Sequence, residues 1–254
     1  LSSKVNGNYR EIKLYDDWYI LDEKFYYYKY TFAFYELLMS ELFKYFNLNC
    51  PSYKIALNDD QYGIISENFR TKESMYFDYN ELHVWKNAKK SGSLIEFRNF
   101  LSSFMDYDKA VSQLNELFRL LAVDFFSGQK DRRHYNILFN VLKKDNSLSL
   151  APLTDNGSIF KDEELESIFY YGGNLIMPKT TMFTKKESKT LEFIDKNPEL
   201  KKYLITCLDI DLSKVINDTL EKYFLSITYD EKINIINYFD IKKRIIENAL
   251  KLIK

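Results

Sequence analysis

The chain has 254 residues, a net charge of −1, 46% hydrophobic residues and 17% aromatic residues. A chain of this length and apolar content folds into one large domain or into two lobes that share a cleft, and it is not disordered as a whole. The nearly balanced charge gives no overall electrostatic reason to expect nucleic acid or an anionic membrane as a direct partner.

The sequence shows no membrane segment or disulfide framework. No stretch approaches the roughly 20 consecutive apolar residues that a membrane-spanning helix needs, and the amino end has no apolar signal-peptide core. Cys50 and Cys207 are far apart in apolar surroundings, which favours buried free thiols and a reducing compartment. We therefore expect a cytoplasmic protein without a membrane span, and secretion as an effector is left open.

The first third of the chain predicts strands around a single helix. Aromatic and β-branched runs are separated by short polar stretches, as strands are separated by turns. Apolar residues in 31–47 follow the spacing of a helix, and Pro51 prevents its continuation. The expected strands are residues 10–14, 18–21, 25–30, 53–57 and 62–66.

From about residue 70 the pattern is mostly helical, with one hairpin. The expected helices are residues 94–104, residues 108–127 ending at Gly128, and four segments that start near 186, 197, 211 and 230; the hairpin strands are 136–141 and 147–153. A simple α/β sheet would alternate throughout. The order instead predicts an α+β fold of protein-kinase type, with a small β-rich lobe of one helix (1–69) and a larger helical lobe (70–254).

Three polar residues around the predicted hairpin carry the chemistry. Asp131 precedes it, Asn136 begins its first strand, and Asp155 follows its second strand. An aspartate can orient and deprotonate an attacking hydroxyl, whereas an asparagine and a second aspartate supply oxygen ligands for the Mg²⁺ that bridges ATP phosphates. Because Asn136 and Asp155 end paired strands, we expect them to meet at one cation.

Two residues of the small lobe complete a phosphotransferase set. Lys29 ends an aromatic strand and is expected to hold the α- and β-phosphates, and Glu36, the first acid of the next helix, is expected to fix that lysine. Considered separately, Lys29 is interpreted as a solvated residue at a strand end, and Glu36 as an acid of the first turn that interacts favourably with the helix dipole. Their order before the three polar residues favours the functional interpretation.

The neighbours of Asp131 are less specific. His134 is expected to orient backbone carbonyls in a loop and not to act as a base. Arg132 and Arg133 are expected either to contact phosphate or to face solvent, and the sequence leaves these two interpretations equal. No zinc site, nucleophile elbow or Walker A loop is present in the sequence.

Five segments between residues 19 and 158 match a known set of motifs. They are a lysine strand at 25–29, a helix and its exit at 36–51, a hinge at 63–69, a catalytic loop at 128–136 and a metal segment at 151–158. Jointly they resemble the HipA-like branch of the protein-kinase superfamily, including its small CtkA-like relatives. The chain departs from that pattern at Gln129, at the later position of His134, and in lacking a clear glycine-rich loop near its amino end.

The resemblance implies a serine/threonine protein kinase that uses ATP and Mg²⁺ and that can phosphorylate itself. It also implies a protein substrate and allows an antitoxin-like partner chain, as in a toxin–antitoxin pair. The implied roles are catalytic base for Asp131, magnesium ligands for Asn136 and Asp155, phosphate anchor for Lys29, and main-chain contacts with adenine for Glu67 and Phe69.

Two other functions are compatible with the sequence. Phosphatidylinositol kinases share a D-R-H-x-x-N loop, so a lipid or small-molecule kinase is the first alternative, although only Lys161 and Lys179 offer charge near the expected activation segment. A pseudokinase or interaction module is the second, and the intact polar set argues against it. The segment from Asp155 to Pro178 is expected to be the activation segment; the candidate sites of self-modification are its serines and threonines, Thr180, Thr181, Ser2 and Ser3.

Overall fold

A computed structural model describes the chain at residues 2–5, 8–11, 13–15, 18–21, 24–29, 33–58, 61–88, 94–129, 132, 136–157, 159 and 190–253. The sequence predictions on Asp131 and on Arg133 with His134 fall outside these residues. So do those on the activation segment beyond residue 159, on Lys161, Lys179, Thr180 and Thr181, and on the helix start near residue 186. Side chains are not described before Phe34, nor at residues 57, 58, 61, 62, 94–96, 190 and 193, so Lys29 is placed by its backbone alone.

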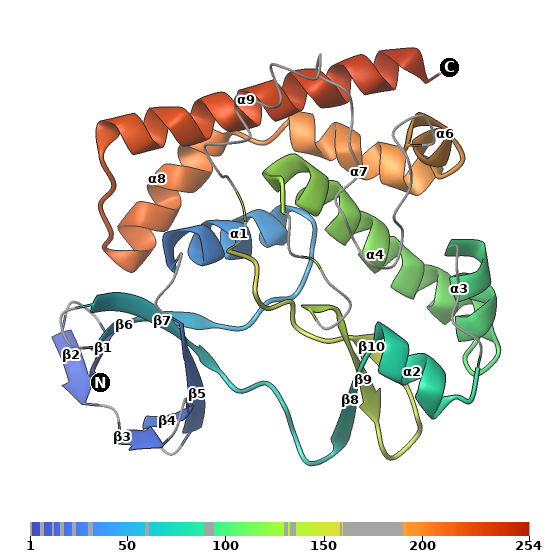
Figure 1. Ribbon diagram of the computed structural model, residues 1–254, viewed down its shortest axis with the longest axis horizontal. Coiled ribbons are helices and arrows are strands. Elements are labelled where there is room, and N and C mark those ends of the chain that lie inside the picture. Colours follow the sequence, from blue (N-terminus) through green and yellow to red (C-terminus); the bar gives the residue numbers. More distant parts are fainter. Residues whose placement is uncertain are drawn as a thin grey trace.

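The amino-terminal strands form one antiparallel sheet with the order β2-β1-β6-β7-β5-β4-β3, which curls at the lower left of Figure 1. All the strands expected from the sequence are present, although residues 10–14 are divided between two strands and β1 was not predicted. The strands are β1 (Ser2–Val5), β2 (Asn8–Glu11), β3 (Lys13–Tyr15), β4 (Trp18–Leu21), β5 (Lys24–Lys29), β6 (Tyr53–Asn58) and β7 (Gln61–Glu67).

Helix α1 (Ala33–Tyr45) joins this sheet to the rest of the molecule. On one face, Leu37 packs with Ile55 and Ile64 of the β6–β7 hairpin. On the other face, Leu38 and Leu42 belong to the main core that the later helices build. Because both faces are apolar, α1 is fixed between two cores, as its central place in Figure 1 shows.

A second, three-stranded antiparallel sheet has the order β10-β9-β8. Its strands β9 (Leu138–Leu142) and β10 (Leu148–Leu150) form the hairpin that the sequence predicts. The outer strand β8 (Ser74–Asp78) was missed because residues 70–78 give no clear alternation, and its burial pattern has none either. Helix α2 (Tyr79–Trp85) follows directly, with a capping box between Asp78 and Glu81.

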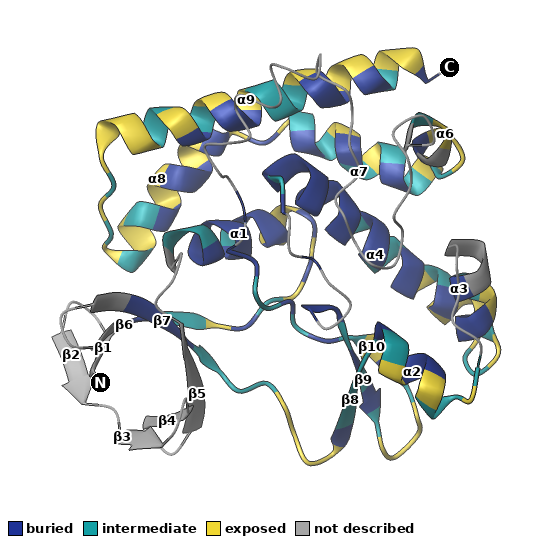
Figure 2. Ribbon diagram, in the orientation of Figure 1, coloured by how far each residue is buried: buried dark blue, intermediate teal, exposed yellow. Residues whose placement is uncertain are grey.

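The remaining described elements are helices. Helix α4 (Tyr107–Ser127) runs through the centre of the molecule and is largely buried (Figure 2). It ends at Gly128, whose φ of 67° is the left-handed conformation that glycine adopts without steric cost. The other helices are α3 (Leu94–Ser102), α6 (Thr190–Asp195), α7 (Pro198–Leu208), α8 (Leu212–Tyr223) and α9 (Tyr229–Leu252).

The starts of the last helices follow their caps. Pro198 lies in the first turn of α7, and the Asp211 carboxylate accepts from the Lys214 N–H at the start of α8. Helix α9 is capped by Thr228, two residues before the expected start, because Thr228 and Glu231 form a capping box. The α+β architecture expected from the sequence is thereby confirmed, whereas the lobe boundary at residues 69 and 70 stays a prediction.

The expectation of unpaired cysteines is confirmed. Cys50 and Cys207 are free thiols, the second of them buried. Burial raises the pKa of both. Across the described ranges, no helix combines the length and apolarity needed to cross a bilayer.

Candidate active site

A cavity of about 410 Å³ lies between the first sheet, helix α1 and the loop after β10. Its volume is in the range of small-molecule sites. The hinge residues predicted from the sequence, Glu67 and Phe69, are part of its wall. The full lining is Glu36, Tyr53, Ile64, Ser66, Glu67, Asn68, Phe69, Arg70, Leu138, Thr154 and Asp155.

The structure brings Asn136 and Asp155 together, as the hairpin geometry predicts. Asn136 is buried just before β9, and its Nδ2 atom donates to Oδ2 of Asp155 at 3.2 Å. Asp155 has a φ of 57°, a left-handed conformation that is unusual for a residue other than glycine. Its carbonyl oxygen accepts from Nε2 of Gln129 at 3.3 Å, so contacts on both sides hold this backbone conformation.

Glu36 reaches from α1 to the segment that follows Asp155. Its side chain is buried, with a relative exposure of 1%. Its two oxygens accept from the backbone N–H of Asn156 at 2.9 and 2.8 Å, and Oε2 accepts from the N–H of Gly157 at 2.8 Å. The sequence did not predict this contact, because 120 residues separate the two partners.

Tyr53 of β6 adds a further donor to the same carboxylate. Its hydroxyl donates to Oε1 of Glu36 at 2.8 Å. Burial, together with the negative charge of Glu36, raises the pKa of Tyr53 well above its usual value. Tyr53 therefore stays a neutral hydrogen-bond donor at physiological pH, at the wall of the cavity.

Lys29 lies at the end of β5, as expected, and its backbone pairs with Ile64 of β7. Since Ile64 lines the cavity, the strand that carries Lys29 borders the same space. The proposed contact between Lys29 and Glu36 stays a prediction.

Arg132 corrects the sequence analysis, because it neither faces solvent nor is placed to contact phosphate. Its side chain has no exposed surface. Nε and Nη2 donate to the two carboxylate oxygens of Asp124 in α4 at 2.9 and 3.0 Å, and Nη1 donates to the carbonyl oxygen of Thr154 at 3.2 Å. A signal for this was present in the sequence: Asp124 stands within an apolar run of a helix, where a charge needs a buried partner.

The two groups of the Arg132–Asp124 pair are both buried, and burial opposes the charge on each. Burial raises the pKa of the Asp124 carboxyl, although the Arg132 guanidinium opposes this effect. Burial by itself lowers the pKa of the guanidinium, but the Asp124 carboxylate outweighs this effect, and the pKa of Arg132 lies above its usual value. Two parallel N–H···O contacts are the strongest geometry for such a pair. The pair therefore anchors the loop before Asn136 to helix α4.

The side chains of Asn136 and Asp155 fit a magnesium ion bound together with a nucleotide. An amide carbonyl and a carboxylate are oxygen ligands of the kind that Mg²⁺ takes. Over the residues that the structure describes, no group of three or more His, Cys, Asp or Glu side chains is able to hold a metal by itself. Mg²⁺ in nucleotide sites is commonly held by one or two protein groups and by substrate phosphates, which matches this donor set.

The comparisons with known proteins give a likeness in fold. No protein-family model matches the sequence, and no curated protein matches it. The crystal structure of the Helicobacter pylori proinflammatory kinase CtkA superposes with a TM-score of 0.69 and 14% identity, over 95% of this chain and 97% of CtkA. The Shewanella oneidensis toxin–antitoxin complex of HipA, HipB and operator DNA contains a chain that superposes with a TM-score of 0.57 and 12% identity.

The second comparison covers 98% of this chain but 62% of the other one, so this chain spans less than two thirds of that length. Both likenesses cover nearly all of the present sequence. The chain has the fold of the HipA- and CtkA-like kinases, and the resemblance predicted from its motifs is confirmed at the level of the fold.

Proposed function

We propose that this protein is an ATP- and Mg²⁺-dependent phosphotransferase that acts on serine or threonine hydroxyls of a protein. The observation that supports this most is the meeting of Asn136 and Asp155 at the cavity that Glu67 and Phe69 also line. The similar H. pylori protein CtkA is a kinase, which supports the same activity.

In the proposed step, the acceptor hydroxyl oxygen forms a bond with the γ-phosphorus of ATP. The bond between that phosphorus and the bridging β,γ-oxygen breaks, ADP leaves with the electron pair, and the hydroxyl proton passes to the Asp131 carboxylate. Bound Mg²⁺ would neutralise phosphate charge, and Asn136 and Asp155 would hold it. Lys29 would hold the α- and β-phosphates, and the backbone at Glu67 and Phe69 would bind adenine.

The free energy needed to form this site favours an enzyme over an inactive scaffold. A left-handed aspartate and a buried ion pair both cost free energy that a passive interaction module has no need to spend. The protein substrate, the antitoxin-like partner, self-phosphorylation and the cytoplasmic location stay predictions.

Phosphate transfer from labelled ATP tests the proposal. We expect Asp131→Asn to reduce transfer by roughly 10²–10⁴-fold while nucleotide binding stays largely intact, because the carboxylate acts on the acceptor. Asp155→Asn should weaken magnesium-dependent nucleotide binding as well, because it removes the charge that faces the metal. Chelation of Mg²⁺ with EDTA should abolish transfer by the unaltered protein.

Asp145→Asn is the matched control. Asp145 lies exposed in the turn between β9 and β10, where its carboxylate accepts from the N–H of Ser147. This substitution should leave both transfer and nucleotide binding unchanged. Full transfer by both Asp131→Asn and Asp155→Asn would contradict the assigned roles, and no transfer by the unaltered protein to itself or to a panel of protein acceptors would contradict the function.

A further inference from the structure

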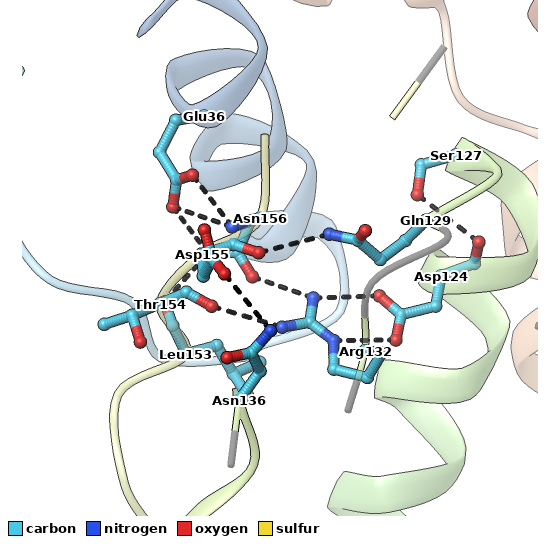
Figure 3. A network of polar contacts seen from close by, with 10 residues as sticks. All are labelled: Glu36, Asp124, Ser127, Gln129, Arg132, Asn136, Leu153, Thr154, Asp155 and Asn156. Carbon is cyan, nitrogen blue, oxygen red and sulfur yellow. Dashed lines mark hydrogen bonds and ion pairs between the residues drawn. The ribbon is translucent and has the colours of Figure 1, made fainter. Parts of the chain in front are cut away.

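A continuous series of buried polar contacts links helix α1 to helix α4 across the loop that carries Asp155 (Figure 3). It runs from Glu36 through Asn156 and Arg132 to Asp124. Arg132, Asn156 and Asp124 each have a relative exposure of 0%. None of these three residues lines the cavity, so a role in the reaction would have to pass through their neighbours.

Asn156 uses both ends of its side-chain amide in this series. Its Oδ1 atom accepts from Nη2 of Arg132 at 2.8 Å. Its Nδ2 atom donates to Oε1 of Glu36 at 3.1 Å and to the carbonyl oxygen of Leu153 at 2.9 Å. An amide of this size supplies both a donor and an acceptor at the right spacing, which an apolar or a charged side chain cannot do.

Arg132 also contacts the loop that carries Asp155. Its guanidinium contacts Asn156 and the carbonyl oxygen of Thr154, the residues on either side of Asp155 in sequence. Its Nε and Nη2 atoms also donate to the Asp124 carboxylate. A planar fork of five N–H donors can serve these acceptors at once, and an ammonium group cannot.

We infer that Arg132 and Asn156 are positioning residues for phosphoryl transfer, which hold Asp155 in its left-handed conformation. This inference rests on the proposed function. The competing role is that of a structural ion pair that stabilises the fold without affecting the reaction. A buried salt bridge by itself is weak evidence for stability, so the two roles must be separated by measurement.

Arg132→Lys separates them because it keeps the positive charge beside Asp124 and removes the fork. We expect kcat to fall by roughly 10–100-fold and the Mg²⁺ concentration for half-maximal transfer to rise by about 10-fold, as is typical when the groups that orient a metal ligand are altered. KM for the protein acceptor should change little. Asn156→Ala leaves the Arg132–Asp124 pair intact and should have the same effects. It is the test variant if Arg132→Lys fails to fold.

The double variant gives a second test. Because Arg132 and Asn156 contact each other and hold the same loop, the losses of kcat caused by Arg132→Lys and Asn156→Ala should be strongly non-additive. Arg119→Lys is the matched control: Arg119 also lies on the α4 side of the molecule and donates to the carbonyl oxygens of Phe46 and Asn47, away from the cavity. Any loss of kcat in Arg119→Lys should add to that in Asn156→Ala, and Arg119→Lys should need the same Mg²⁺ concentration as the unaltered protein.

Hydrogen exchange supplies a readout that does not depend on turnover. The backbone N–H groups of Asn156 and Gly157 are held by Glu36 in the free protein, and we expect Arg132→Lys to speed their exchange by at least about 10-fold while Arg119→Lys leaves it unchanged. Unchanged exchange, or an unchanged Mg²⁺ requirement in folded Arg132→Lys, would overturn the inference. Absence of transfer by the unaltered protein would overturn the proposed function instead, and the exchange rates would still decide whether Arg132 holds the loop.

Discussion

Helix α1 carries two glutamates, each with a tyrosine partner, of which Glu36 is fully buried and Glu41 is partly exposed. Glu36 is buried and accepts from backbone N–H groups of the loop after Asp155 and from Tyr53 at 2.8 Å. Glu41 lies on the rim of the helix, where it forms ion pairs with Lys44 and Lys222, the latter at 2.6 Å, and accepts from the hydroxyl of Tyr223 at 3.4 Å.

The difference between these two carboxylates lies in what their partners can do. Backbone N–H groups are fixed by the fold, and burial removes the competition of water, so Glu36 determines where the loop with Asp155 lies. Lysine side chains are flexible and solvated. The ion pair of Glu41 with Lys222 therefore links α1 to α8 without determining the position of either helix closely. We therefore expect substitutions at Glu36 to affect the reaction and substitutions at Glu41 to affect stability slightly.

The largest effect is expected for Glu36→Gln. The variant places an NH₂ group against the N–H donors of Asn156 and Gly157, so at least one buried donor loses its acceptor. We expect the free energy of unfolding to fall by about 3 kcal/mol and phosphate transfer to fall by roughly 100-fold. Urea unfolding and transfer from labelled ATP measure the two effects. Glu41→Gln is the control, and equal losses of transfer in both variants would contradict the comparison.

An intermediate effect is expected for Tyr53→Phe. It removes a hydrogen bond to a buried carboxylate, which is worth about 1.5 kcal/mol, and transfer should decrease a few-fold because Glu36 keeps its backbone contacts. Tyr223→Phe removes a longer contact to Glu41 and should cost about 0.5 kcal/mol without changing transfer. The pair of phenylalanine variants is compared by thermal unfolding and by initial rates. A larger loss of transfer in Tyr223→Phe would reverse the assignment.

The smallest effect is expected for Glu41→Gln, and it should depend on pH. Burial by itself raises the pKa of the Glu41 carboxyl, but the contacts with Lys222 and Lys44 outweigh it, and the pKa lies below its usual value. The stabilisation is therefore fully present above the unfolded pKa of about 4.3 and is lost as the pH falls through the lowered folded pKa.

The measurement is the free energy of unfolding of both proteins as a function of pH and salt. At neutral pH and low salt the unaltered protein should exceed Glu41→Gln by about 0.5 kcal/mol, after allowance for solvent screening. The difference should shrink as the pH falls below about 4 and also at high salt. A difference that grows toward acid pH would show that the lysine contacts do not stabilise the charged form.

Much of the fold follows from local signals in the sequence. The end of α4 was predictable from Gly128, because only glycine takes the left-handed backbone there without cost. The start of α7 followed from Pro198. Strand β8 was not predictable, because its partners in β9 lie 60 to 68 residues away and its own sequence lacks a regular alternation.

The residue types of the candidate site were also local information. Asp131, Asn136 and Asp155 stand in an order and spacing that indicate phosphoryl transfer, and the contact between Asn136 and Asp155 followed from the hairpin between them. The side chain of Lys29 and the whole of Asp131 lie outside the described residues, so their roles stay predictions.

What the sequence alone determined is therefore the α+β order of elements and the identity of the polar residues, because capping, periodicity and spacing act over a few residues. The tertiary structure decided which of those residues are buried together. The apolar run around Asp124 indicated a buried partner, but no local feature identified Arg132 as that partner, and the partners of Glu36 lie 120 residues away. Burial depends on which distant segments pack around a side chain, and only the folded chain brings Asp124, Asn156 and Glu36 around one loop.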